Sequence, residues 1–292
     1  MFVEFFLAAT VLVIGLVLWW PRWRLRRLLA APFPAAWREL LTRRLPLYAR
    51  LDADLQAQLQ QLIKRFLDGK TFYGCGGLAI DDDIRVLIAA QACLLLLNRP
   101  SDAFADLRYL LVYPDAFVVP RVERRAGGVV VSGDVDMEGE SWDSGKVILS
   151  WEDVQLDAAN DDNGYNVVLH EFAHQLDQQS GAADGTPLLR ERASYQRWAE
   201  VMEREYRRLQ QDEASGRQGL LDHYGASDPA EFFAVITEVF YEQPHQLALA
   251  HPDLFELLQA YYCVDPRRWQ GEPAAPQAGS AGGWPSRCGA GR

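Results

Sequence analysis

One helical segment constrains the fold more than any other part of the chain. Residues 163–177, NGYNVVLHEFAHQLD, place two histidines, a glutamate and an aspartate among valines, leucines and a phenylalanine. On a helix, His170 and His174 are four residues apart and project from the same face. Apolar side chains fill most of the remaining circumference, so we expect the helix to be buried. Buried imidazoles need partners, and the question is whether that partner is a metal ion.

Residues 170–174, HEFAH, fit the H-E-x-x-H pattern. Histidines at i and i+4 can offer two nitrogens to one zinc ion, and Glu171 can act as the general base on its water. A catalytic zinc ion usually has three protein ligands, so a third ligand must lie elsewhere. The alternative is that His170 and His174 are core residues hydrogen-bonded to backbone groups or carboxylates.

The residues after the motif exclude one subclass of zinc peptidase. The extended metzincin pattern requires glycine and histidine where this chain has Asp177 and Ser180. Asp177 shares a helix face with both histidines, so it can orient one imidazole from behind the ligand shell.

Several glutamates can supply the third ligand. Glu231 falls at the third position of a helix that we expect to begin at Pro229, with Asp228 as its N-cap. The same D-P-A-E pattern is also that of a helix cap, which needs no metal. Other glutamates lie at a distance typical of thermolysin-like zinc enzymes, and spacing alone does not exclude them: Glu191, Glu200 and Glu203.

The N-terminus predicts a membrane anchor. Residues 2–20 are apolar with Glu4 as the only charge, which is about the length of a membrane-spanning helix. Tryptophans and four arginines follow, which the positive-inside bias would keep in the cytoplasm. The sequence therefore predicts residues 1–20 as a transmembrane helix in a bacterial inner membrane and 21–45 as a basic juxtamembrane connector. The alternative is a buried or interfacial helix.

Residues 46–270 are expected to form the catalytic domain in the cytoplasm. Short β-branched and aromatic runs between 108 and 155 predict a small sheet, and the remainder has helical periodicity. The tail, 271–292, is rich in Ala, Gly, Pro and Ser and is expected to be disordered. The net charge is −11; residues 1–50 carry +6, which leaves −17 on the rest and argues against direct nucleic-acid binding.

Three stretches, GKVILSWEDV, NVVLHEFAHQLD and YGASDPAEFFAVITEVFY, resemble the Mlc titration factor A family of zinc metallopeptidases. The resemblance spans roughly residues 35–268, and the family's core is similar to that of anthrax lethal factor. It implies an α+β, mainly helical zincin-type domain with a small β-sheet, here preceded by one transmembrane helix. It also implies one Zn²⁺ per chain on His170, His174 and Glu231, with Glu171 as base. Tyr224, seven residues before Glu231, then becomes the donor to the oxyanion.

The implied reaction is peptide-bond hydrolysis, and the resemblance suggests aminopeptidase-type action on short substrates. Residues 146–154 can be an exposed edge strand that pairs with an extended substrate or an ordinary core strand. The family name records binding to a glucose-responsive transcriptional repressor. An alternative function is therefore a membrane-tethered docking protein that sequesters a repressor without hydrolysis.

Overall fold

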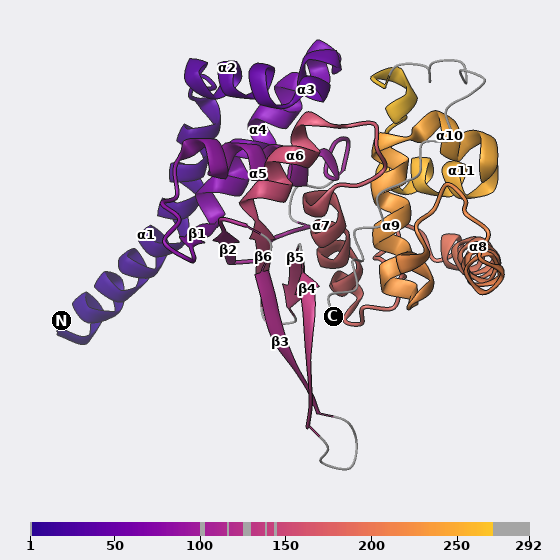
Figure 1. Cartoon of the computed structure of the whole chain (residues 1–292). Coiled ribbons are helices and arrows are strands. Elements are labelled where there is room, and N and C mark those ends of the chain that lie inside the picture. Colours follow the sequence, from indigo (N-terminus) through magenta and orange to yellow (C-terminus); the bar gives the residue numbers. More distant parts are fainter. Residues whose placement is uncertain are drawn as a thin grey trace.

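The computed structural model describes residues 2–99, 103–115, 117–124, 130–137, 139–142 and 145–270, so the predicted tail 271–292 lies outside the described residues. Helices dominate the fold, and a small sheet lies beside them (Figure 1). The longer helices are α1 (Phe2–Ala30), α2 (Ala35–Arg44), α4 (Ala53–Gly69), α5 (Asp82–Leu94), α6 (Trp151–Ala159), α7 (Val167–Asp177), α8 (Ser194–Ser215), α9 (Pro229–Glu242) and α11 (Pro252–Tyr262). The shorter helical segments are α3 (Pro46–Arg50), α10 (Pro244–Ala250), η1 (Gln178–Ser180), η2 (His223–Ala226) and η3 (Pro266–Arg268).

The main sheet has four strands in the order β1-β2-β6-β5, formed by β1 (Thr71–Gly74), β2 (Tyr109–Tyr113), β6 (Lys146–Ser150) and β5 (Gly139–Trp142). β2 is parallel to both β1 and β6, whereas β5 is antiparallel to β6. β6 is therefore paired on both sides and is not an edge, so the edge-strand interpretation of 146–154 is wrong. A separate hairpin, β3 (Phe117–Arg124) with β4 (Val130–Met137), extends away from the helices (Figure 1).

Helix α1 corrects the prediction of a membrane anchor. Within the described residues, no helix combines the length and the apolar composition that a bilayer crossing requires. The apolar run is instead the first part of one continuous helix that passes through Pro21 into the arginine-rich segment. The end of this helix packs on α4: Arg24 pairs with Asp68 at 2.8 Å, and Lys64 Nζ donates to the carbonyls of Leu28, Leu29 and Ala31.

The prediction of a transmembrane helix at 1–20 is therefore wrong, and the inner-membrane placement that depended on it is unsupported. Residues 21–45, expected to be a connector, form the end of α1 and helix α2. Helix α2 buries Leu40 and Leu41 in the core of the domain.

The core forms around α5, α7 and α9. All nine residues of α5 from Val86 to Leu94 are buried, and Phe172 of α7 packs edge-on against Phe104, with ring centroids 4.9 Å apart. Burying a side chain of that size stabilises a fold by about 1.5–3 kcal/mol. Both α7 and α9 begin at a side-chain cap: Asn166 accepts from the amide of Leu169, and Asp228 accepts from that of Glu231, each at 3.0 Å. Caps of this kind fix where each helix starts, and so fix the face that each presents.

Candidate metal centre

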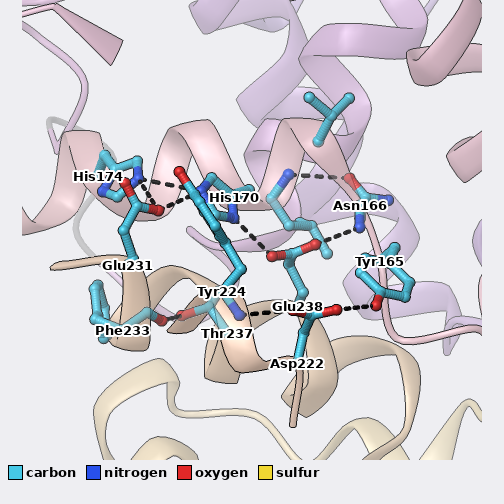
Figure 2. Close-up of polar contacts among 12 residues, drawn as sticks. Tyr165, Asn166, His170, His174, Asp222, Tyr224, Glu231, Phe233, Thr237 and Glu238 are labelled. Atoms are coloured by element: carbon cyan, nitrogen blue, oxygen red, sulfur yellow. Dashed lines mark hydrogen bonds and ion pairs between the residues drawn. The ribbon is translucent and has the colours of Figure 1, made fainter. Parts of the chain in front are cut away.

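Three side chains from two helices meet at one point (Figure 2). His170 and His174 project from one face of α7, and Glu231 projects from the first turn of α9. Glu231 Oε2 lies 3.0 Å from His170 Nε2 and 3.4 Å from His174 Nε2, and the two imidazole nitrogens are 3.2 Å apart. The structure therefore brings together the two histidines and the glutamate that the sequence singled out.

These distances match the spacing of ligands around a tetrahedral ion. Donor atoms about 2.0–2.1 Å from zinc, at tetrahedral angles, lie roughly 3.3 Å from one another. The two rings are nearly perpendicular, at 80°, and their Nε2 atoms approach each other to 3.2 Å. Two imidazole nitrogens and one carboxylate oxygen are also a usual donor set for catalytic zinc. The residues present fit a divalent transition metal.

Glu231 is both near a helix cap and at the cluster. Asp228 Oδ1 caps α9 by itself, accepting from the amides of Ala230 and Glu231. The Glu231 carboxylate is therefore not needed for the cap and points at the histidines. The competing glutamates on α8 point elsewhere: Glu203 is paired with Arg207 and is 63% exposed, and Glu200 accepts from Gln196.

No second cluster of this kind occurs in the part of the chain that the structure describes. Among those residues, His170, His174 and Glu231 are the one group of three or more potential ligands with all donor atoms within 4.8 Å.

Asp177 follows the two histidines on α7, but it does not orient an imidazole as the sequence suggested. Its Oδ2 accepts from the amide of Gly185 at 2.7 Å, and the carbonyl of Gly185 accepts from Trp198 Nε1 at 2.9 Å. The carboxyl is fully buried, and that burial raises the pKa of Asp177 to about 6. Asp177 thus holds the loop that follows the motif helix, rather than orienting an imidazole.

The residue that contacts the far nitrogen of an imidazole is Glu238, whose role the sequence analysis missed. His170 Nδ1 lies 2.7 Å from Glu238 Oε1, and the other oxygen of Glu238 accepts from the amide of Asn166 at 2.7 Å. A carboxylate in this position fixes the ring orientation and the tautomer of a metal-binding histidine. The available signal was that Glu238 lies seven residues after Glu231 and shares its stripe on α9.

The charges of the site are strongly coupled. Burial disfavours the imidazolium of His170, but the carboxylates of Glu238 and Glu231 outweigh it and hold its pKa well above the ordinary value. Burial also opposes ionisation of Glu231, yet hydrogen bonds with His170 and His174 keep the pKa of Glu231 well below its usual range. At Glu238, burial prevails and raises the pKa. Because a histidine must be neutral to bind a metal, a divalent cation that binds here would displace the proton of His170.

A buried polar network continues from Glu238 toward the core. The Asn166 amide nitrogen Nδ2 donates to Gln91 Oε1 at 2.9 Å and to Glu242 Oε1 at 3.2 Å. The other oxygen of Glu242 accepts from the amide of Gly164 at 3.2 Å. The residue that caps α7 is thus also held by α9, which fixes the motif helix on the helix that carries Glu231.

The two residues expected to take part in chemistry lie at the cluster. Glu171 is buried on α7, next to His170. The ring of Tyr224 lies over His170, with centroids 6.1 Å apart and planes at 35°, although 56% of the side chain is exposed. Burial of the phenol and the nearby carboxylates of Glu231 and Glu171 raise the pKa of Tyr224, so it stays a protonated donor.

Comparison with known proteins shows the family of the chain. Residues 19–263 match the family described as glucose-regulated metallo-peptidase M90. The chain is 41% identical over 248 residues to the uncharacterized protein slr2042 of Synechocystis, which covers 85% of this chain and 90% of that protein. It is 33% identical over 237 residues to Mlc titration factor A of Pectobacterium atrosepticum (77% and 87% covered) and 34% identical over 252 residues to that of Cronobacter sakazakii (85% and 92%). These matches confirm the resemblance inferred from the sequence, and the chain belongs to the glucose-regulated metallopeptidase family M90.

Proposed function

We propose that the protein is a zinc-dependent peptidase in which His170, His174 and Glu231 hold one zinc ion per chain. The observation that carries the proposal is the triangle of donor atoms, with sides of 3.0, 3.2 and 3.4 Å. Hydrogen-bonded core histidines would need no such equilateral arrangement with a carboxylate. Membership of a metallopeptidase family supports the same reading.

The surrounding residues supply the rest of the chemistry. A zinc ion in this site would polarise the scissile carbonyl and bring the pKa of water there to about 7. Glu171 accepts the proton of the attacking water and delivers it to the leaving amine. Tyr224 donates a hydrogen bond to the oxyanion that develops on the carbonyl. Glu238 holds His170 in the orientation that the ligand set requires.

We further propose short peptides as substrates, cleaved from the amino terminus. This finer point rests on the family resemblance and has its own test. The rate on a chromogenic peptide with a free amino terminus should exceed that on its acetylated counterpart. Equal rates would contradict aminopeptidase-type action but not peptidase activity.

A second candidate function is binding of a transcriptional repressor without hydrolysis. It is favoured by the name Mlc titration factor A, which several relatives carry. Replacement of Glu171 separates the two functions, because repressor binding would survive the loss of the general base.

The test compares the full-length chain with Glu171→Gln, Glu231→Ala and Glu203→Ala. Elemental mass spectrometry should find about one zinc in the wild type, in Glu171→Gln and in Glu203→Ala, and much less in Glu231→Ala. Peptide hydrolysis should be lost in Glu171→Gln and Glu231→Ala and kept in Glu203→Ala, whose carboxylate only pairs with Arg207. A Glu171→Gln variant that hydrolyses peptides at the wild-type rate would refute the mechanism.

A further inference from the structure

Tyr224 lies on a short turn whose main packing partners are two helices other than the motif helix. The turn, η2, contacts α8 and α9. Gly225 fits so closely between them that a Cβ there would lie 3.2 Å from Leu209 and 3.3 Å from Val235. Tyr206 of α8 donates to the carbonyl of Ala226 at 3.0 Å. These contacts fix the turn relative to α8 and α9, and leave open what sets Tyr224 relative to His170 on α7.

One carboxylate makes that connection (Figure 2). Asp222 Oδ1 accepts from the amide of Tyr224 at 2.7 Å, and its Oδ2 accepts from the hydroxyl of Tyr165. Tyr165 directly precedes Asn166, the cap residue of α7. The two oxygens of Asp222 thus join the start of the motif helix to the backbone of the residue that faces the metal cluster.

We propose that Tyr165 and Asp222 form a positioning clasp that sets the phenol of Tyr224 against the metal cluster. The contacts of the clasp do not depend on the proposed function, but its effect on catalysis rests on that function. The phenol oxygen is at the far end of a long side chain, so a small rotation of η2 is amplified there. A misplacement of about 1 Å at a reacting centre can cost on the order of 100-fold in rate.

The first experiment replaces the tyrosine hydroxyl alone. Tyr165→Phe keeps the ring and removes the donor to Asp222. We expect kcat to fall about tenfold, with KM and zinc affinity unchanged, because Tyr224 acts on the transition state. The matched control is Tyr48→Phe. It removes the hydroxyl of Tyr48 on α3, which accepts from Gln60 on α4 at 2.7 Å, away from the metal cluster. Its kcat should equal that of the wild type.

A double-mutant cycle shows whether the clasp acts through Tyr224. In a Tyr224→Phe background the oxyanion donor is already missing, so adding Tyr165→Phe should cause no further fall in kcat. A purely structural role would lower kcat by the same factor in both backgrounds. Such additivity would overturn the inference.

The second experiment uses metal-free protein and no substrate. The amide of Tyr224 donates to Asp222 Oδ1 at 2.7 Å, and the amide of Gly225 donates to the backbone carbonyl of Asp222 at 3.1 Å. Loss of the clasp should raise hydrogen exchange at these two amides by about fivefold to tenfold in Tyr165→Phe and leave it unchanged in Tyr48→Phe.

The outcomes are separable. Unchanged exchange in Tyr165→Phe would overturn the clasp, and so would an unchanged kcat in an active enzyme. A wild-type chain that binds zinc but cleaves no peptide would contradict the proposed function, and the exchange measurement would still decide whether the clasp holds η2.

Discussion

Gly185 offers a sharp test of how the third ligand is placed. Its φ is +76°, in the region that favours glycine, and its amide and carbonyl are held by Asp177 and Trp198. A Cβ on Gly185 would lie 3.0 Å from the carbonyl carbon of Pro229 and closer still to its oxygen. Pro229 is the first residue of α9, two positions before Glu231. Gly185→Ala should therefore push on the turn of helix that carries the ligand.

The structure separates two contributions to the cost. Holding alanine in the left-handed region costs about 1–2 kcal/mol at either of two glycines. Gly216, which ends α8, has φ +66° with nothing within 4 Å of its Cβ position, so Gly216→Ala bears that cost alone. At Gly185 the overlap with Pro229 adds about 1–3 kcal/mol, typical of overpacking. The expected total is about 2–5 kcal/mol, against about 1–2 kcal/mol for the control.

The assays are thermal unfolding of metal-free protein and zinc competition with a chromogenic chelator. In a domain of this size, each kcal/mol of lost stability lowers Tm by about 2–4 °C. The Tm of Gly185→Ala should therefore fall clearly further than that of Gly216→Ala. Displacement of α9 should also weaken zinc binding at least tenfold in Gly185→Ala only, because the triangle of donor atoms tolerates little movement. Equal Tm and equal zinc affinity in the two variants would refute the reasoning.

Two further predictions concern buried carboxyls. Burial raises the pKa of Asp177 from 3.8 to about 6, so the folded state favours the protonated carboxyl. This preference stabilises the fold fully below pH 4, and the contribution, about 3 kcal/mol, is lost as the pH rises through 6. The Asp177→Asn variant should therefore unfold at a higher denaturant concentration than the wild type at pH 7.5, but not at pH 4. A difference between the two unfolding midpoints that does not change with pH would contradict the raised pKa of Asp177. Glu238→Gln should weaken zinc affinity about 10–100-fold with Glu203→Gln as control, and unchanged affinity would show that Glu238 does not orient His170.

The ligand face of the motif helix could be predicted from the sequence, because it depends on helical period alone. His170 and His174 had to share one face, and the structure places their Nε2 atoms 3.2 Å apart. The third ligand could not be chosen in this way. Glu231 and its competitors on α8 differ only in how two distant helices pack, and the family resemblance, not spacing, selected Glu231.

The errors share a physical cause. The apolar run at residues 2–20 has the composition of a span, but composition does not show that the same helix continues into Arg24 and packs on Asp68. The strand β1, four residues in a glycine-rich stretch, is too short for a periodic signal and exists through parallel pairing with β2. The clasp residue Asp222 bonds to Tyr165, 57 positions earlier in the chain. Each of these errors and omissions concerns a partner distant in sequence.

The pairing of α7 with α9 nevertheless follows a rule that the sequence contains. Helix α9 is mostly apolar, yet it carries Glu231, Glu238 and Glu242 at intervals of seven and four, on one face. Buried carboxylates are costly unless each finds a partner, so that face must meet polar groups in the same order. It does: Glu231 meets His174 and His170, Glu238 meets His170 and Asn166, and Glu242 meets Asn166 and Gly164. As the residue numbers of the glutamates increase along α9, the residue numbers of their partners decrease, so the two helices run antiparallel. The need to satisfy two buried carboxyl groups, Glu238 and Glu242, and the half-buried Glu231 thus accounts for both the direction and the register of the pair that holds the metal site.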